Sequence, residues 1–386
     1  MHDFRRATRL LEVMAEKIIS PSEAMSLAIS EAKKGHGWVS PNPVVGCVIL
    51  DSAGHLLSQG YHKKVGGPHA EIEALRAIQD QTQLNGAQVF VTLEPCSHHG
   101  RTPPCADALS RLPLKEVTFG LLDPNPKVSG RGAAMLRAVG IKCTEWPAGA
   151  IKDELNELAE IFLYNQREQK TFVSLKIATS LDGRMGLKGG ESKWITGEEA
   201  REFSHLLRAQ YDVVIIGKRT FLEDDPSLNV RLEGFEAHQN AVVIVDPRGE
   251  CISKIANSNL AKVRPLNKIF IATLDGPSTA EGVQLLRVQK NATGKMDIEH
   301  LLSLLWQNEL KSVFVEGGAH TFAGFLESRL IQRLHLFLAP NLIGGAFGIS
   351  WTEHFGKEKL SDRLEFEKLS PVHLGRDLYL SLNLSK

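Results

Sequence analysis

Apolar and polar positions along the 386-residue chain fall into two successive patterns of short buried strands and amphipathic helices. In the first, the apolar run at residues 44–50 predicts a buried strand, and the turn residues 51–54 predict a hairpin into a second strand that ends at Gly60. We expect two further strands at residues 88–93 and 116–122, and helices that begin at Ser22, His69, Pro103 and Gly130. Strands that alternate with helices predict a three-layer α/β domain.

The second pattern follows a helical stretch at residues 151–167, which we interpret as a connector between two domains. After it, the sequence predicts strands at residues 171–176, 212–216, 241–245, 268–272 and 312–315 and helices at residues 198–209, 298–306 and 320–330. A chain of this length also exceeds the usual size of a single hydrophobic core. We therefore expect an N-terminal extension at 1–21, an α/β domain at 22–150, the connector at 151–170 and a second α/β domain at 171–386.

The composition is that of an ordinary globular protein, with 42% hydrophobic and 23% charged residues. Lysine and arginine together number 45, as do aspartate and glutamate, so no net charge attracts the chain to nucleic acid or to an acidic surface. No apolar run approaches the roughly 18 residues that cross a bilayer. We therefore expect neither a nucleic-acid partner nor a membrane.

The N-terminus and the cysteines indicate the compartment. Arg5, Arg6 and Arg9 precede Leu10, but charged residues interrupt any apolar core, so we expect a short amphipathic helix or a tail here and no secretory signal. The five cysteines are an odd and widely spread set, which argues against a disulfide framework. These features predict a cytoplasmic protein.

The candidate chemistry of the first half centres on His69, Glu71, Cys96 and Cys105. One imidazole and two thiolates can hold a zinc ion and leave a fourth position for a water that the metal activates. Zinc-dependent base deaminases combine such ligands with a glutamate that moves protons to the ring nitrogen and to the departing ammonia. We therefore expect His69, Cys96 and Cys105 to hold one zinc ion and Glu71 to move the protons.

The spacing of the two cysteines departs from the general pattern of these enzymes, in which two residues separate them. Here eight residues, 97–104, lie between them, and they include Ser97, His98, Arg101 and Thr102. Basic and hydroxyl side chains beside backbone N–H groups suit a bound phosphate. The insertion therefore indicates a phosphorylated substrate.

Several segments of the first half match motifs of a known family. They are Asn42-Pro43-x-Val45-Gly46, Gly60-Tyr61-His62, His69-Ala70-Glu71, the unbroken string from Thr92 to Cys105, and Asp123-Pro124-Asn125-Pro126. With these segments the first half resembles the deaminase half of the bifunctional riboflavin-biosynthesis deaminase/reductase. The long central string is far more specific than a general deaminase motif.

This resemblance implies a reaction and further contacts. The family removes the 2-amino group of 2,5-diamino-6-(5-phosphoribosylamino)pyrimidin-4-one and forms 5-amino-6-(5-phosphoribosylamino)uracil. The resemblance implies that Asn42 and His62 line the base pocket. It also implies that the ribosyl phosphate portion is held by His98, Arg101, Asp123 and Asn125. For His99 we expect no such role.

In the second half, a strand, the turn Glu316-Gly317-Gly318 and a helix start form an arrangement that binds phosphate or pyrophosphate. No Gly-x-Gly-x-x-Gly fingerprint follows the first strand of this half, which argues against a standard Rossmann site. Segments at residues 176–183, 194–196, 207–208, 224–231 and 315–318 are similar, in this order, to the reductase half of the same family. The resemblance implies a dihydrofolate-reductase-like α/β domain that uses NADPH.

The resemblance covers roughly residues 22–384 and implies hydride transfer to C1 of the ring-opened ribosyl group, which becomes a ribityl chain. It implies NADPH contacts at Ala178, Trp194, Thr220, Asp224 and Gly318. It implies substrate contacts at Ser192, Arg208, Leu228, Arg231 and Glu316. The two arginines suit a phosphate, because guanidinium binds it through a bidentate fork. Lys176 and Asp182 are candidates for positioning near the transferred hydride, and Trp194 could instead belong to the core.

Two other interpretations stay open. The chain could be a tRNA or nucleoside base deaminase with an unrelated C-terminal domain, although the balanced charge and 6% aromatic residues do not predict a basic, aromatic groove. It could also be a zinc-stabilised scaffold, which needs a fourth protein ligand such as His98 or His99. The family resemblance instead implies a homo-oligomer, a dimer or a tetramer, that acts on a small phosphorylated pyrimidine.

Overall fold

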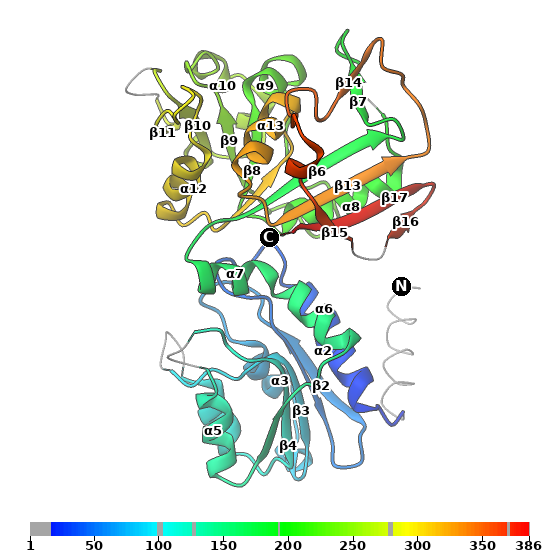
Figure 1. Ribbon diagram of the computed structural model, residues 1–386. Helices are drawn as coiled ribbons and strands as arrows, with labels where there is room; N and C mark the ends of the chain where they lie inside the picture. Colours follow the sequence, from blue (N-terminus) through cyan, green and yellow to red (C-terminus); the bar gives the residue numbers. More distant parts are fainter. Residues whose placement is uncertain are drawn as a thin grey trace, which may run out of the picture. The chain divides into compact units, whose positions relative to one another are not determined.

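The computed structural model describes residues 17–98, 103–125, 129–191, 194–276, 281–368 and 371–385, so most of the expected N-terminal extension lies outside the described residues. The chain divides into two compact units, unit 1 at Met1–Gln169 and unit 2 at Lys170–Lys386 (Figure 1). Among the helices described, none is both long enough and apolar enough to cross a membrane.

Unit 1 is built on a five-stranded sheet with the order β2-β1-β3-β4-β5. Its strands are β1 Gly46–Leu50, β2 Leu56–Tyr61, β3 Gln88–Leu93, β4 Glu116–Leu121 and β5 Lys142–Glu145. β1 pairs antiparallel with β2 and β3, whereas β3, β4 and β5 run parallel. The carboxyl ends of β3 and β4 therefore meet at one edge, which is where α/β sheets carry their ligand sites.

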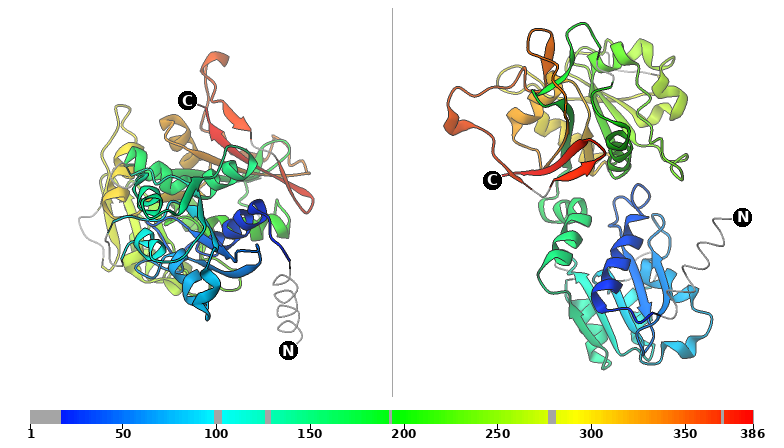
Figure 2. Two further views of the ribbon diagram at one scale, coloured as in Figure 1. Left: turned by 90° about the horizontal axis from the view of Figure 1, so that it is seen from below. Right: turned by 90° about the vertical axis from the view of Figure 1, so that its right-hand side faces the viewer.

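Helices cover both faces of this sheet (Figure 2). One layer consists of α3 Ala70–Ala77, α4 Cys105–Ser110 and α5 Arg131–Ala138, and the other of α2 Pro21–Lys33, α6 Ala150–Leu158 and α7 Glu160–Glu168. Alternate residues of β3 point to opposite layers, so Val89 and Val91 belong to the core beneath α3, while Phe90 belongs to the core beneath α2. The predicted three-layer α/β fold is confirmed.

The predicted single helix at residues 151–167 is wrong in one respect. The structure has two helices, α6 and α7, that meet at Ala159, where φ is −98° and ψ is 5°. Leu155, Ala159 and Leu163 are buried in the same core as Met25 and Phe90. This segment is therefore a packed layer of unit 1.

Unit 2 is built on a ten-stranded sheet with the order β11-β10-β9-β8-β12-β6-β13-β17-β15, in which β16 also pairs with β17. Its strands are β6 Phe172–Ser180, β8 Val213–Gly217, β9 Ala241–Val245, β10 Ile269–Thr273, β11 Gln284–Arg287, β12 Ser312–Val315, β13 Arg333–Ala339, β15 Phe366–Lys368, β16 Val372–Leu374 and β17 Asp377–Leu384. All neighbours from β11 to β13 are parallel, and β15, β16 and β17 add an antiparallel edge. β7 Arg184–Leu187 and β14 Gly348–Ser350 form a separate antiparallel pair.

Six helices connect these strands: α8 Glu198–Ala209, α9 Lys218–Asp224, α10 Ile252–Ile255, α11 Asn259–Val263, α12 Ile298–Gln307 and α13 Ala319–Ser328. The sheet separates two cores, because Val213 and Ile215 of β8 belong to one and Val214 and Ile216 to the other. The α/β class is therefore confirmed for unit 2 as well. The sequence analysis predicted α8, β9 and β12 with their observed bounds but missed β11 and all strands after α13.

Candidate active sites

The three predicted zinc ligands converge at the sheet edge of unit 1. Cys96 follows β3, His69 is the N-cap of α3, and Cys105 is the first residue of α4. His69 Nδ1 lies 3.5 Å from Cys96 Sγ and 3.3 Å from Cys105 Sγ, and the three ligand atoms all lie within 4.8 Å of one another. Within the described residues no fourth side chain joins this group, and His98 is exposed.

These distances fit a zinc ion. Zinc–nitrogen and zinc–sulfur bonds of about 2.0 and 2.3 Å at a tetrahedral angle separate the two ligand atoms by about 3.5 Å. The backbone N–H of Cys105 donates to Cys96 Sγ at 3.3 Å. The hydrogen bond between the two thiols lowers the pKa of Cys96 to about 4 and raises that of Cys105. One thiolate is therefore present at neutral pH before any metal binds, and three protein ligands leave one position open, as in catalytic zinc sites.

Glu71 lies in the first turn of α3, two residues after the zinc ligand His69, and is only 3% exposed. Burial and, next in size, the negative charge of Cys96 raise the pKa of Glu71 to about 7. A carboxyl group that titrates near neutrality can both accept and donate a proton. The structure therefore gives Glu71 the environment that proton transfer requires.

Asn42 and His62, the two predicted base-pocket residues, lie together beside His69. The Nδ1–H of His62 donates to the carbonyl of Pro68 at 2.9 Å, which leaves Nε2 to accept from the Asn42 amide at 3.3 Å. The His62 and His69 rings make an edge contact with centroids 5.4 Å apart. Burial lowers the pKa of His62, so the ring is neutral and presents a defined tautomer at neutral pH.

The loop after β4 carries Asp123 and Asn125, and the buried carboxylate of Glu94 holds this loop. Glu94 Oε2 accepts from the backbone N–H of Gly130 at 2.9 Å and of Asp123 at 3.4 Å, and Oε1 accepts from Ala133 at 3.1 Å. Asp123 Oδ1 in turn accepts from the N–H of Asn125 at 2.9 Å. Glu94 thus caps the start of α5 and ties the loop to the segment that carries a zinc ligand.

The remaining predicted contacts of unit 1 are only partly visible. Burial raises the pKa of Asp123, and the positive charge of His98 acts against that rise, which places the two side chains near each other. Arg101 and His99 lie outside the described residues. The structure therefore brings together Asp123, Asn125 and His98 of the predicted phosphate contacts.

In unit 2, Arg208 at the end of α8 and Glu316 after β12 form a buried bidentate pair. Arg208 donates from Nε to Glu316 Oε1 at 2.6 Å and from Nη2 to Oε2 at 3.0 Å. Lys176 Nζ of β6 lies 3.9 Å from the same carboxylate. Burial is the largest single influence on Glu316 and opposes its ionisation, but the charge and hydrogen bonds of Arg208, together with the charge of Lys176, hold its pKa below the usual value. Three residues from separate strands and helices thus form one charged group.

Arg231 and His205 complete this group. His205 Nδ1 lies 3.2 Å from Arg208 Nη1 and accepts from the backbone N–H of Arg231 at 3.4 Å. Burial and then the charge of Arg208 lower the pKa of His205 to about 4, so the ring is neutral. Lys176, Arg208 and Arg231 therefore face the single carboxylate of Glu316. An excess of positive charge in a partly buried group suits a phosphate.

The glycine turn lies where β8, β12 and α13 meet. A Cβ on Gly217 would lie 2.6 Å from Thr321 Oγ1, and one on Gly317 would lie 2.7 Å from Thr321 Cβ. Gly318 is the N-cap of α13, no side chain caps the helix there, and a Cβ on Gly318 would lie 3.8 Å from Thr220 Oγ1. An uncapped helix start beside the ends of parallel strands fits a phosphate or pyrophosphate. The predicted cofactor contacts Thr220 and Gly318 therefore lie together.

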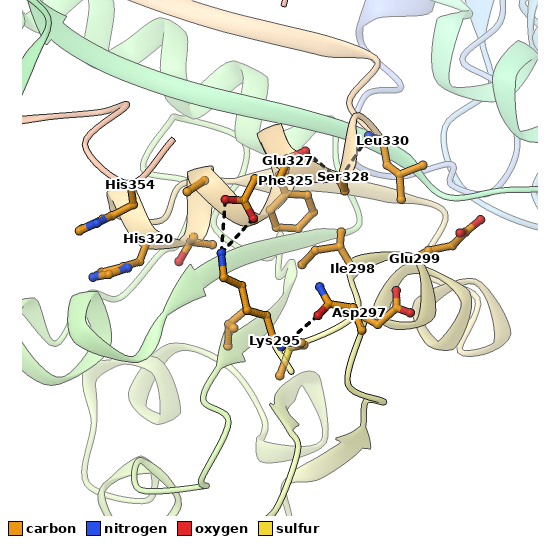
Figure 3. Close-up of a pocket in the computed structure, with 16 residues that line it drawn as sticks. Lys295, Asp297, Ile298, Glu299, His320, Phe325, Glu327, Ser328, Leu330 and His354 are labelled. Atoms are coloured by element: carbon orange, nitrogen blue, oxygen red, sulfur yellow. Dashed lines mark hydrogen bonds and ion pairs between the residues drawn. The ribbon is translucent and has the colours of Figure 1, made fainter. Parts of the chain in front are cut away.

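A cavity of about 430 Å³ runs along α13 from this turn (Figure 3). Figure 3 shows the Lys295 amine directed at the Glu327 carboxylate, 3.1 Å away, and the His320 ring stacked on His354 with centroids 3.4 Å apart. Thr321 also lines the cavity, which joins it to the glycine turn.

Two of the predicted cofactor contacts are exposed side chains. Trp194 is 65% exposed and the Arg201 guanidinium lies over its ring at 4.5 Å, so the alternative of a core tryptophan is wrong. Asp224 is the last residue of α9 and is exposed, while Ala178 is half-buried within β6. Ser192, predicted to bind substrate, lies outside the described residues.

Asp182 organises the turn after β6. Its carboxylate accepts from the Ser180 hydroxyl at 2.6 Å and from the backbone N–H groups of Ile343 and Gly344 at 3.1 and 2.7 Å. The hydrogen bond from Ser180, followed by that from Ile343, lowers the pKa of Asp182 to about 2. These contacts join the turn to the loop after β13.

The sequence analysis missed Glu94 and His205. A buried acidic residue directly after an apolar strand is a detectable signal for Glu94, because such a carboxylate needs hydrogen-bond donors. His205 stands three residues before Arg208 and therefore on the same face of α8, which was the available signal for it.

Two protein-family models match the chain. Residues 19–121 match the zinc-binding region of cytidine and deoxycytidylate deaminases, and residues 171–380 match the RibD C-terminal domain. The riboflavin biosynthesis protein RibD of Actinobacillus pleuropneumoniae is 36% identical over 94% of this chain and 95% of its own length. The chain belongs to the RibD family. It is a bifunctional deaminase and reductase of riboflavin biosynthesis with a small-molecule substrate.

Other relatives cover both halves. RibD of Escherichia coli K12 is 35% identical over 93% of this chain and 98% of that protein. The solved structure of Acinetobacter baumannii RibD, form 1, is 36% identical and covers 94% of this chain and 98% of its own, with a TM-score of 0.79. A deaminase/reductase structure from Thermotoga maritima is 31% identical over 94% of this chain and 98% of its own, with a TM-score of 0.80.

These findings decide between the interpretations of the sequence. The zinc-binding family match and the His-Cys-Cys group confirm zinc as a cofactor. The match over residues 171–380 shows that the second half is a RibD-type domain, which does not favour a base deaminase with an unrelated C-terminal domain.

Proposed function

We propose that the chain catalyses two consecutive reactions on one phosphorylated pyrimidine. Water replaces the 2-amino group of 2,5-diamino-6-(5-phosphoribosylamino)pyrimidin-4-one, and ammonia leaves. The product, 5-amino-6-(5-phosphoribosylamino)uracil, then takes a hydride at C1 of its ring-opened ribosyl group and becomes the ribityl compound. The Thermotoga maritima relative is named a diaminohydroxyphosphoribosylaminopyrimidine deaminase/5-amino-6-(5-phosphoribosylamino)uracil reductase, which supports this pair of substrates.

The observation that carries the deamination is the His69, Cys96 and Cys105 group beside the buried Glu71. In our proposal the three residues hold one zinc ion, which when bound supplies an activated water. Glu71 takes one proton from the attacking water and delivers it to the ring nitrogen. It then takes the proton of the hydroxyl group so formed and passes it to the amine, which leaves as ammonia while the carbonyl forms and the carboxylate is restored. The burial of Glu71 beside the three ligands supports this role, because the carboxyl group is shielded from bulk water.

The other residues of unit 1 position the substrate in this proposal. The amide of Asn42 and the neutral ring of His62 orient the base beside the zinc ligands, and their 3.3 Å hydrogen bond fixes which polar atoms they present. The ribosyl phosphate portion contacts His98, Arg101, Asp123 and Asn125. The hold of Glu94 on the loop after β4 supports this placement of Asp123 and Asn125.

Reduction takes place in unit 2 in this proposal, where NADPH when bound supplies the hydride. NADPH contacts Ala178, Trp194, Thr220, Asp224 and Gly318. The substrate contacts Ser192, Arg208, Leu228, Arg231 and Glu316. The excess positive charge around Glu316 supports a phosphate at this group, and Lys176 stands beside it. Asp182 supports the surrounding loops through its hydrogen bonds.

The proposal extends to organisation and compartment. We assign deamination to residues 22–150 together with the segment 151–170, which packs on the same core, and reduction to residues 171–386. We propose a homo-oligomer, a dimer or a tetramer, as the family resemblance implies. The five cysteines are all free of disulfides, which supports a reducing compartment such as the cytoplasm.

The deciding experiment follows ammonia release and NADPH oxidation in parallel after the diaminopyrimidinone phosphate is added to the zinc-loaded protein. We expect both signals, with NADPH consumption delayed until ammonia has been released. Adding the already deaminated uracil compound should remove the delay. Ammonia release without NADPH oxidation would support deamination alone. NADPH oxidation without ammonia release would support reduction alone.

A further inference from the structure

The loop between α9 and β9 holds two residues in a left-handed backbone conformation that favours glycine. Asp225 has a φ of 37° and Leu228 a φ of 48°. The Leu228 side chain is only 7% exposed and packs in a core of unit 2, so its backbone is fixed in an unfavourable region. Strain of this kind persists only where the surroundings impose it.

Two residues at opposite ends of α11 impose part of this conformation. The backbone N–H of Asn259 donates to Asp225 Oδ1 and the Asn259 amide donates to the Asp225 carbonyl, both at 2.9 Å. Arg264, just past α11, donates from Nη2 to the carbonyl of Ser227 at 2.5 Å. The backbone is thus held at Asp225 and again at Ser227, immediately before the left-handed residue Leu228.

The other end of the loop is held by the charged group itself. Arg208 Nη1 donates to the carbonyl of Asn229 at 2.7 Å while the same guanidinium pairs with Glu316. Leu228 is therefore enclosed between two guanidinium contacts, one on the residue before it and one on the residue after it. A shift at either contact would move the residues that our proposed function gives to the substrate.

Arg264 is an unusual residue to find in this role. It is 4% exposed, and its Nε and Nη1 have no hydrogen-bond partner among the residues that the structure describes. It lies near enough to Arg208 for the two positive charges to interact. A buried cation beside another cation opposes folding, so its presence calls for a compensating role. Arg264 therefore adds a further positive charge beside Arg208, which itself pairs with Glu316.

We propose that Arg264 is a positioning residue of the reductase site. Through the Ser227 carbonyl it holds Leu228 and Asn229 in the geometry that receives the substrate, and its charge adds to the attraction for the substrate phosphate. It touches neither the reacting carbon nor the cofactor. This inference rests on the reduction assigned to unit 2, and it makes Arg264 a determinant of substrate affinity and not of the hydride step.

The test compares Arg264→Met with wild type in the full-length, zinc-loaded protein. Reduction of the already deaminated substrate is measured at saturating NADPH. We expect KM for the substrate to rise at least about tenfold, which is about 1.4 kcal/mol, while kcat and KM for NADPH change less than about threefold. Arg264→Lys keeps the positive charge and a hydrogen-bond donor for the Ser227 carbonyl. Its substrate KM should therefore lie between those of the wild type and Arg264→Met.

Arg363→Met is the matched control. Arg363 is also an arginine of unit 2 that donates to a backbone carbonyl, that of Leu360 at 3.0 Å, but its side chain is 59% exposed. We expect this control to leave every kinetic constant of reduction unchanged. Ammonia release by unit 1 serves as an internal control in each variant.

Two results would overturn the inference. One is an unchanged substrate KM in Arg264→Met. The other is that kcat, the affinity for NADPH and the melting temperature all fall together in both Arg264→Met and Arg264→Lys. That result would show that Arg264 supports the structure of unit 2 in general. If Arg264→Met does not fold, Asn259→Ala replaces it as the test variant. It should raise the substrate KM by releasing the Asp225 carbonyl, and an unchanged KM would contradict the inference. Absence of reduction in wild type would contradict the proposed function instead.

Discussion

Two clusters of buried charge, one in each unit, differ in how their charges are compensated. The zinc group of unit 1 consists of the three zinc ligands with Glu71 and Glu94. The arginine group of unit 2 consists of Glu316 and the cations Lys176, Arg208, Arg231 and Arg264. In unit 1, Glu94 accepts three backbone N–H groups, the two zinc-site thiols share a hydrogen bond, and Glu71 titrates near neutrality. Unit 2 instead concentrates cations around the single carboxylate of Glu316. The first site needs a metal to be complete, whereas the second needs an anion.

Because of this difference, we expect substitutions in the two groups to change different measured quantities. Changes at the zinc group should act on the chemical step, because we propose that Glu71 exchanges protons with the reacting atoms. Changes at the arginine group should act on affinity and on stability, because its charges depend on one another. Both groups hold a loop by its backbone, but Glu94 does so by accepting hydrogen bonds and Arg208 and Arg264 by donating them.

The largest effect is expected for Glu71→Gln. The amide cannot carry a proton between water, ring nitrogen and amine, so the rate of deamination should fall about 10²–10⁴-fold. Zinc content, measured per chain, should stay at the wild-type value, and reduction of the deaminated substrate should be unchanged. Ammonia release at nearly the wild-type rate would show that another group moves the protons.

Arg208→Met should have the next largest effect, because it leaves Glu316 buried without its bidentate partner. Removing one member of a buried ion pair costs about 3–5 kcal/mol, so the thermal unfolding of unit 2 should occur at a lower temperature and the substrate KM for reduction should rise. The double variant Arg208→Met, Glu316→Gln should recover much of the stability but not the KM. Recovery of both would mean that the pair is only structural.

Glu94→Gln should weaken the hold on the loop after β4, because the amide nitrogen faces N–H donors. We expect the KM for deamination to rise about tenfold, which is about 1.4 kcal/mol, with zinc retained. Glu154→Gln is the control, since Glu154 forms an exposed pair with Lys33 that contributes little. An unchanged KM with lower zinc content would instead assign Glu94 to the metal group.

The smallest effect is expected for Gly317→Ala. Its Cβ would lie 2.7 Å from Thr321 Cβ, so the glycine turn must shift at the start of α13. A several-fold rise in KM for NADPH should follow, with the substrate KM unchanged. Gly356→Ala, at a position with nothing within 4 Å of the added Cβ, should change neither constant. If Gly317→Ala and Gly356→Ala changed the KM for NADPH equally, the glycine turn would have no specific role in NADPH binding.

The zinc group could be predicted because its residues lie in short contiguous sequence motifs. His69 and Glu71 share one helix start, and Cys96 and Cys105 bracket one insertion, so local structure alone brings most of these residues to the edge of the sheet. The apolar runs also predicted β3 and β12 with their observed bounds, because fully buried strands give an unbroken hydrophobic signal.

The arginine group could not be assembled from the sequence by physical reasoning. Arg208, Glu316 and Arg264 come from elements more than fifty residues apart, and the pairing of β8 with β12 and with β9 brings these elements side by side. An arginine just past a five-residue helix such as α11 gives no local signal that it is buried. β13 and β17 were missed although Leu378, Leu380 and Leu382 of β17 stand at every second position, which is the pattern of a half-buried strand.

The burial of Leu155 and Leu163 has a practical meaning for anyone who wishes to separate the two activities by cutting the gene. The zinc-binding family match ends at residue 121, yet one face of the sheet in unit 1 is covered by α6 and α7, which continue to Glu168. A fragment that stops at the edge of the match would expose Phe90 and Met25 to water and invite aggregation. The shortest self-sufficient deaminase therefore extends through Gln169, and the motif-based boundary is about fifty residues too early.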